Sequence, residues 1–294
     1  MALTDNIIAY YKLDGNSNDS VASNNGTDTS ITYNASYAKI TQGTYLDANT
    51  DVINFSDWGL GTGNWSISFW VQEKTSQTAN TYFISGQSGG NLWGFYIGSG
   101  ATTKIRINHN DSSTDNFFDS TGTLAIDTYS FITFTKSSDT ITCYINGTAS
   151  GSLTGYSSRN FGGSTHNSIG RSGSSATAYI DEVGVWSRAL SGAEVTELYN
   201  SGSGLAYPFN ITSTADNGSF ILTGQDATAT VGYTSTADNG SFVLTGGDDF
   251  ATITGGWTNT TKSSTATMTN PSKSATTYSN TSKSSSTWTN QTKS

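Results

Sequence analysis

The sequence has little of several residues that often define a fold or a site. It contains one cysteine, Cys143, so no disulfide can form within the chain. It has 2 prolines, 12% charged residues and no apolar run near the length of a membrane span. The 2 histidines, His109 and His166, are not spaced as a metal pair or a catalytic triad. These absences argue against a disulfide scaffold, a membrane helix and common forms of metal-dependent or triad catalysis.

Charge is unevenly distributed along the chain. The formal net charge is −9, but from Trp257 onward there are four lysines and no acidic residue. The tail therefore carries +4 and the body −13, which argues against nucleic acid as a partner. The segment Met1–Asn6 has neither a basic n-region nor an apolar h-region, so we expect no secretory signal.

Short alternating segments separated by Gly and Asn turns predict an all-β, antiparallel fold with an aromatic-rich core. In the segment 65–71, Ile67, Phe69 and Val71 are expected on one face, and Trp65 and Trp70 on the other. Cys143 alternates with isoleucines, which indicates a buried, inert thiol. One short helix is expected over 191–200, where Ser191 and Glu194 can form a capping box. The other predicted strands are 92–97, 104–108, 130–135 and 140–145, the last running into the hairpin signal Asn146-Gly147.

Two kinds of repeat follow the first 207 residues. The segment 212–224 returns almost unchanged as 234–246, and each copy predicts short strands that must stack on a neighbour. From 257 onward a large apolar residue recurs with an asparagine and a lysine at fixed offsets, at Trp257, Met268, Tyr278 and Trp288. This pattern fits one strand and turn per unit, ordered by partner chains, or a Ser/Thr-rich linker. The predicted divisions are 1–207, 208–256 and 257–294.

Four motifs in the first 207 residues resemble the laminin-G-like family of concanavalin-A-like jelly rolls. They are 8–20 with Asn24–Thr27, 65–71, 141–147 and 179–191. The resemblance implies an antiparallel jelly-roll β-sandwich over 1–207. The segment Tyr129–Thr135 departs from the family pattern because it lacks the usual Trp and His.

The same resemblance implies a structural calcium ion between the first Asp/Asn loop and the closing strand. Calcium prefers six to eight hard oxygen ligands, which such loops can supply. The alternative is that the loop is only a set of Asx turns. The ligands implied are Asp14, Asn16, Asp19, Asn25 and Asp181.

The sequence favours a binding protein over an enzyme. Glycosidases of this architecture need two acidic groups across a cleft, and the Glu-X-Asp-X-X-Glu strand of the sandwich glycosidases is absent. Sugar would instead bind by aromatic stacking and amide hydrogen bonds. His109 is expected to be a solvated turn residue. The candidate ligand residues are Trp93, Tyr96, Asn108 and Asn110, for which ordinary strand and turn roles are the alternative.

The repeats resemble, more loosely, segments of phage fibre and appendage proteins. The leading hypothesis is a non-enzymatic virion structural protein, located on the particle surface. It would display the lectin-like domain toward a host glycan or receptor, contact other virion proteins and form a homo-oligomer through its C-terminal repeats. A purely architectural, protein-binding role is a second possibility. A bacterial surface adhesin or secreted carbohydrate-binding protein is a third.

Overall fold

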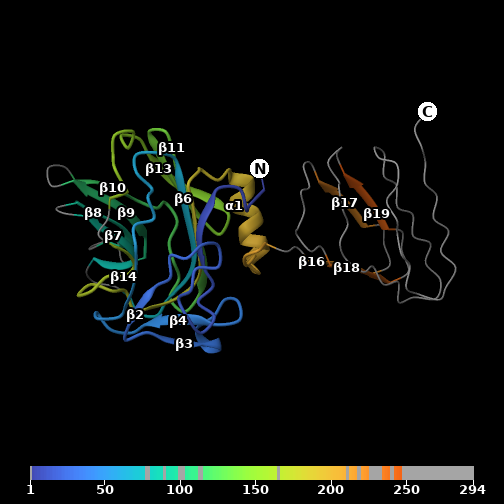
Figure 1. Cartoon of the computed structure of the whole chain (residues 1–294), viewed down its shortest axis with the longest axis horizontal. Coiled ribbons are helices and arrows are strands. Elements are labelled where there is room, and N and C mark those ends of the chain that lie inside the picture. The colour runs from blue at the N-terminus through green and yellow to red at the C-terminus, as the bar shows by residue number, and fades with distance from the viewer. Residues whose placement is uncertain are drawn as a thin grey trace. The chain divides into compact units, whose positions relative to one another are not determined.

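The computed structural model divides into two units, Met1–Phe209 and Asn210–Ser294, which are described separately (Figure 1). The segment 257–294, for which strand-and-turn repeats are expected, lies outside the described residues. The structure describes residues 2–76, 80–88, 91–98, 103–111, 115–163, 166–209, 212–216, 220–224, 234–238 and 242–246.

The first unit is a sandwich of two sheets, and every named strand pair in it is antiparallel. The eight-stranded sheet runs in the order β13 (Thr148–Leu153), β12 (Thr140–Ile145), β11 (Tyr129–Ser137), β6 (Trp65–Glu73), β15 (Ala178–Trp186), β4 (Gly43–Leu46) and β3 (Thr32–Asn34), with β1 (Ile7–Tyr11) paired to β15. The seven-stranded sheet runs in the order β10 (Asp115–Asp119), β9 (Ile105–Asp111), β8 (Asn91–Ile97), β7 (Thr81–Ser88), β14 (His166–Gly170), β5 (Val52–Phe55) and β2 (Thr27–Thr29). The prediction of an antiparallel jelly-roll sandwich is confirmed.

Aromatic residues fill the space between the sheets, as their abundance predicts. The ring of Phe95 stacks on Phe134 at 4.3 Å between centroids and on Phe69 at 6.2 Å, which joins the two sheets. Trp65 belongs to this core together with Ile67. Its expected place on the opposite face is wrong, because odd-numbered residues of β6 share one face. Trp70 lies on the other face, where its ring stacks on Tyr199 at 5.8 Å.

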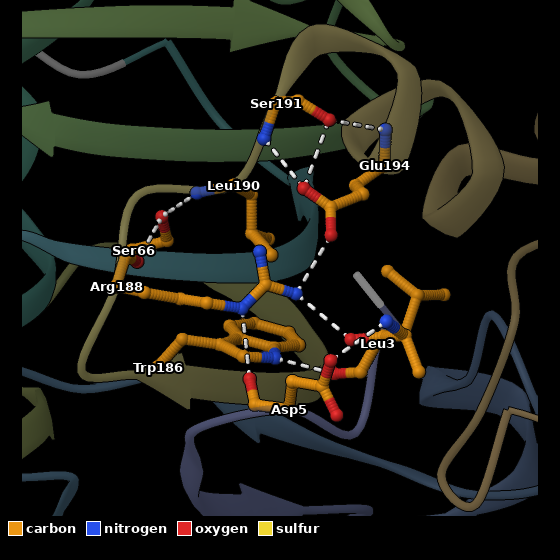
Figure 2. A network of polar contacts seen from close by, with 9 residues as sticks. Leu3, Asp5, Ser66, Trp186, Arg188, Leu190, Ser191 and Glu194 are labelled. Carbon is orange, nitrogen blue, oxygen red and sulfur yellow. Dashed lines mark hydrogen bonds and ion pairs between the residues drawn. The ribbon is translucent and has the colours of Figure 1, made fainter. Parts of the chain in front are cut away.

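A short helix and a polar network cover part of the outer face of the eight-stranded sheet. The helix α1 (Gly192–Tyr199) begins with the predicted capping box of Ser191 and Glu194. Figure 2 shows the network that ties it to the sheet: Arg188 pairs with Glu194 at 2.7 Å and donates to the Asp5 carbonyl at 2.8 Å. Two 3₁₀ helices, η1 (Ala35–Tyr37) and η2 (Asn200–Gly202), complete the unit. No helix in the described part of the chain is long and apolar enough to span a membrane.

The first unit extends past the predicted boundary at 207. The ring of Phe209 is buried and packs on Tyr10 at 5.4 Å and on Trp186 at 6.1 Å. Because this residue fills part of the outer face of the eight-stranded sheet, the unit ends at Phe209.

The second unit shows how the two long repeats pair. Strand β16 (Thr212–Asp216) pairs with β18 (Thr234–Asp238), and β17 (Phe220–Gly224) pairs with β19 (Phe242–Gly246). Both pairs are parallel and place identical or similar residues side by side, as in Phe220 opposite Phe242. The repeats therefore stack in register, each copy supplying one strand to each of two small sheets.

Candidate binding surfaces

Most of the predicted calcium ligands instead hold the backbone of the first loop. Asp19 accepts hydrogen bonds from the amides of Tyr10, Val21 and Asn24 at 3.0–3.3 Å. Asn25 Oδ1 accepts from the Asp19 amide at 2.9 Å. These oxygens have the donors expected of Asx turns.

The other three predicted ligands divide between that loop and a second one. Asn16 Oδ1 accepts from the Asn18 amide at 2.9 Å within the first loop. Asp14 Oδ1 accepts from the Gln42 amide at 3.0 Å, and Asp181 Oδ2 accepts from the Lys39 and Ile40 amides at 2.8 and 2.7 Å. Asp14 and Asp181 therefore both fix the segment 39–42. In the described residues no three His, Cys, Asp or Glu side chains form a group that could hold a metal.

Two adjacent carboxyl groups are buried beside this segment. Asp181 is 0% exposed and Glu182 is 2% exposed. Asp181 Oδ1 and both Glu182 carboxyl oxygens lack a donor in hydrogen-bonding geometry. Burial, together with the charges of Glu182 and Asp14, raises the pKa of Asp181 to about 9. Burial and Asp14 likewise raise the pKa of Glu182 to about 8, while the nearby Tyr10 hydroxyl lowers it.

The backbone explains why the sequence did not point to Glu182. It lies at a bulge of β15, where the pairing with β6 shifts between Asp181 and Gly184, and its φ is 52°. A positive φ is uncommon for a residue with a side chain, and alternation alone would have placed Glu182 in the core. The Asp181 and Glu182 oxygens that lack a donor suit a hard cation chemically, whereas the oxygens of Asn16, Asp19 and Asn25 accept backbone amides.

Of the four predicted ligand residues, Trp93 lies in the core. It is 2% exposed and its indole Nε1 donates to the Phe161 carbonyl at 3.0 Å. Side chains alternate along a strand, and Trp93 faces the core. Tyr96, Asn108 and Asn110 occupy positions that face the other way, so they lie on the outer face of the seven-stranded sheet. Tyr96 is nevertheless 2% exposed and Asn108 9% exposed.

His109 is buried in strand β9, not solvated in a turn. Its ring packs edge-on against Phe161 at 4.6 Å, and its Nε2 is 2.8 Å from the Asn160 carbonyl oxygen. The strand continues to Asp111 because its polar residues pair fully with β8 and β10. The polar composition of 108–111 had favoured a loop.

The sequence did not predict a cluster of half-buried tyrosines on the outer face of the eight-stranded sheet. We call Tyr37, Tyr45 and Tyr179 the tyrosine cluster. Tyr45 and Tyr179 are register partners on β4 and β15, with ring centroids 4.9 Å apart. Tyr37 of η1 lies 5.4 Å from the Tyr45 ring and 4.9 Å from the Tyr179 ring.

Polar side chains border the tyrosine cluster. Lys74 Nζ lies 4.7 Å from the centre of the Tyr179 ring and forms an ion pair with Asp127. Gln72, the register partner of Tyr179 on β6, donates to the Asp127 carbonyl at 2.6 Å. Ammonium, amide and phenol donors therefore surround three aromatic rings.

The loop that carries Tyr37 is held in place from beneath. The hydroxyl of Tyr129 donates to the Tyr37 carbonyl at 2.6 Å. Gly43 approaches the same carbonyl so closely that a Cβ would lie 2.3 Å from its oxygen. Together with the two amide bonds to Asp181, these contacts fix the backbone of the segment that carries Tyr37.

Most of the first unit matches the model of a known protein superfamily. Residues 47–196, about half of the chain, match the model of the Concanavalin A-like lectin/glucanases superfamily. No curated protein sequence matches significantly.

Solved structures that resemble the chain include binding domains of toxins and one domain of an arabinanase. The binding domain of Paraclostridial Mosquitocidal Protein 1 superposes with TM-score 0.57 at 16% identity over 68% of this chain and 53% of that chain. Domain 4 of AbnA, an extracellular arabinanase from Geobacillus stearothermophilus, in complex with arabinotriose, gives TM-score 0.54 at 21% identity over 65% of this chain and 97% of that chain. The binding domain of botulinum neurotoxin DC in complex with rat synaptotagmin II gives 0.56 at 13% identity over 68% and 52%. This chain thus spans about half the length of the toxin domains, and the likeness concerns the fold.

Proposed function

The chain belongs to the Concanavalin A-like lectin/glucanases superfamily, and we propose that it is a non-catalytic protein whose first unit binds glycans at the tyrosine cluster. The observation that carries the proposal is the contact of Tyr37, Tyr45 and Tyr179 beside Lys74 and Asp127. Sugars offer apolar C–H faces and hydroxyls at once, and tyrosine rings with polar neighbours complement both.

The chemistry of the cluster favours a glycan over a protein partner. Protein interfaces have an apolar centre and bury about 800 Å² on each partner. Among the described large hydrophobic residues only Phe117 and Ile126 are exposed, and Ile126, next to Asp127, is by itself too small for an apolar centre. The arabinanase domain, which has a similar fold and whose structure contains arabinotriose, supports the proposal by analogy of fold.

A hydrolytic role has little physical support. A glycosidase needs one carboxyl group to be the acid and another to be the nucleophile or base, both facing the substrate. Asp181 and Glu182 are adjacent in sequence and buried within the fold. Their raised pKa values follow from burial among structural contacts, which is a common cause apart from catalysis.

A glycan array with the full chain, followed by calorimetry on the best neutral and acidic hits, tests the proposal. We expect Tyr179→Ala to weaken binding at the cluster by about tenfold or more, equivalent to about 1.4 kcal/mol. Tyr144→Ala is the matched control, since Tyr144 is half-buried on the same sheet outside the cluster. An array without hits, or equal losses in both variants, would remove the site.

Calcium is a second part of the proposal, with a smaller ligand set than the sequence suggested. Asp181 and Glu182 would supply carboxylate oxygens to the ion, with loop carbonyls and water completing its shell, and the ion would neutralise this buried pair and stiffen the segment 39–42. After chelation, added calcium should raise the melting temperature of the wild type, and Asp181→Asn should abolish that rise. Asn16→Ala should keep it. Loss of the rise in Asn16→Ala, or no rise in the wild type, would contradict this assignment.

The third part concerns assembly and display. In the described residues the stacked repeats form two-stranded sheets. Such sheets are marginal alone, so pairing with another chain would stabilise them. We expect them to form homo-oligomers that present the first unit, as a fibre or appendage on a virion would, toward a host glycan or receptor. A surface adhesin remains the alternative. Light scattering should give an oligomer for the full chain and a monomer for a chain ending at Phe209; two monomers would contradict this role of the repeats.

A further inference from the structure

Phe117 lies on the opposite sheet from the tyrosine cluster and is unusually open to solvent. It is 44% exposed, and of the described large hydrophobic side chains only Ile126, at 40%, is comparable. It belongs to β10, the last strand of the seven-stranded sheet. An exposed ring on a binding-type sandwich is a natural stacking surface.

The guanidinium of Arg106 packs against the ring of Phe117. The guanidinium carbon of Arg106 lies 4.1 Å from the ring centre. Arg106 is fixed in turn by two hydrogen bonds to Asp119, at 2.6 and 2.9 Å. One face of the ring is therefore occupied, and the exposed fraction belongs to the rest of the ring.

A buried acceptor without a donor lies directly beside this ring. Asn108 is the register partner of Phe117 across β9 and β10, so their Cβ atoms are about 5 Å apart. Asn108 is 9% exposed, and its Oδ1 has no hydrogen-bond partner. A buried acceptor left unpaired costs about 1–3 kcal/mol, which a ligand hydroxyl could recover.

The charges at this position cancel. Arg106 and Asp119 form a bidentate ion pair, and Phe117 and Asn108 are uncharged. An acidic ligand would have to compete with Asp119 for the guanidinium, so the surroundings favour a neutral ligand with hydroxyl donors.

We propose that Phe117 and Asn108 form a second carbohydrate site, for a neutral sugar, on the outer face of the seven-stranded sheet. The sugar stacks on the exposed part of Phe117, and binding turns the Asn108 amide so that its Oδ1, enclosed in the unliganded fold, accepts a sugar hydroxyl. This inference shares its ligand class with the proposed function but uses separate residues on the other sheet. The first unit then binds two sugars, one on each outer face.

Calorimetry of the full chain with arabinotriose and a set of neutral tri- to pentasaccharides tests this site, because it counts sugars per chain whatever the oligomeric state. We expect two per chain for the wild type and one for Phe117→Ala. Asn108→Leu should also give one, and should not lower the melting temperature because it removes an unpaired buried acceptor. Ile126→Ala, the matched exposed control, should still give two.

The remaining outcomes separate the two proposals. One sugar per chain, lost in Tyr179→Ala and kept in Phe117→Ala, overturns the second site alone. One sugar lost in Phe117→Ala and kept in Tyr179→Ala supports the second site and overturns the tyrosine site. No sugar bound by the wild type in this set overturns the second site, and the broader array then decides the proposed function.

Discussion

At the scale of single residues, the least expected groups are buried polar ones. Lys136 is fully buried on β11, yet its ammonium donates to three carbonyls, of Thr62, Gly63 and Ser138, at 2.6–3.1 Å. Burial lowers the pKa of Lys136, but these acceptors satisfy all three of its donors. The side chain therefore fastens the loop before β6 to the end of β11.

Replacing this ammonium should destabilise the fold. We expect Lys136→Met to lower the free energy of unfolding by about 2–4 kcal/mol, because three carbonyls lose a charged donor. Lys104→Met is the control, since no hydrogen bond or ion pair of the Lys104 side chain is seen in the described structure. Urea titration measures both; equal changes would show that the three bonds contribute nothing.

The two buried acids predict a pH dependence of opposite sign to ordinary acid denaturation. The pKa values of Asp181 and Glu182 are raised to about 9 and about 8, so the folded state binds protons that the unfolded state has released. Their contribution is complete below the unfolded pKa, about 4, and is lost as pH rises toward 8–9. Each group contributes at most about 1.4 kcal/mol per pH unit.

In chelator, unfolding free energy measured from pH 5 to pH 9 should therefore fall. Asp181→Asn should flatten the fall because an amide cannot ionise. Asp119→Asn serves as the comparison, since Asp119 is paired at the surface of another sheet. A wild-type profile that rises through this range would contradict the assigned sign.

At the scale of elements, the network of Figure 2 decides how α1 is attached. Arg188 and Glu194 are both largely buried, and Glu194 also caps the helix. Burial opposes ionisation of Glu194, but the bonds from Arg188 and Ser191 outweigh it and hold its pKa below the usual value. Removing one partner leaves the other charge buried, which is the costly case.

We expect Arg188→Met and Glu194→Gln each to lower the free energy of unfolding by about 3 kcal/mol, because each leaves a buried charge without its partner, although glutamine still serves the capping box. A double-mutant cycle should give a coupling above about 1 kcal/mol. Glu197→Gln, on the same helix without an ion pair in the described structure, should be nearly neutral. Additive single changes would show that the pair is not coupled.

The sequence predicts secondary-structure elements better than it predicts which side chains the fold brings together on them. Alternation and turns locate β6, β11, β12 and α1 because these signals are local. The bulge at Glu182 and the burial of His109 depend on neighbouring strands, so local polarity misplaced both. The tyrosine cluster brings together residues 37, 45 and 179: strand register makes Tyr45 and Tyr179 neighbours, and the fold of the loop with η1 adds Tyr37. Asn108 was selected from the sequence, but its partner Phe117 was not.

At the scale of the whole molecule, the first unit has a core of its own and a definite end. Phe209 and Leu205 are buried on the outer face of the eight-stranded sheet. In the described part of the chain, the repeats that follow form two pairs of parallel strands.

Truncation should locate this end sharply. A chain ending at Phe209 should keep the melting temperature of the first unit. A chain ending at Gly204 loses two buried apolar side chains. We expect its free energy of unfolding to be lower by at least about 3 kcal/mol. Calorimetric scans compare the two; equal melting temperatures would show that the segment 205–209 does not stabilise the unit.

Trp186 contacts both ends of this unit. Its indole Nε1 donates to the Leu3 carbonyl at 2.7 Å, and its ring stacks on Phe209. The backbone therefore enters and leaves the sandwich at nearly the same point. A module of this kind can be grafted into a surface loop of an unrelated host, because closing the host loop over a short gap costs little entropy. The surfaces proposed to bind sugar would then move with the module into its new host.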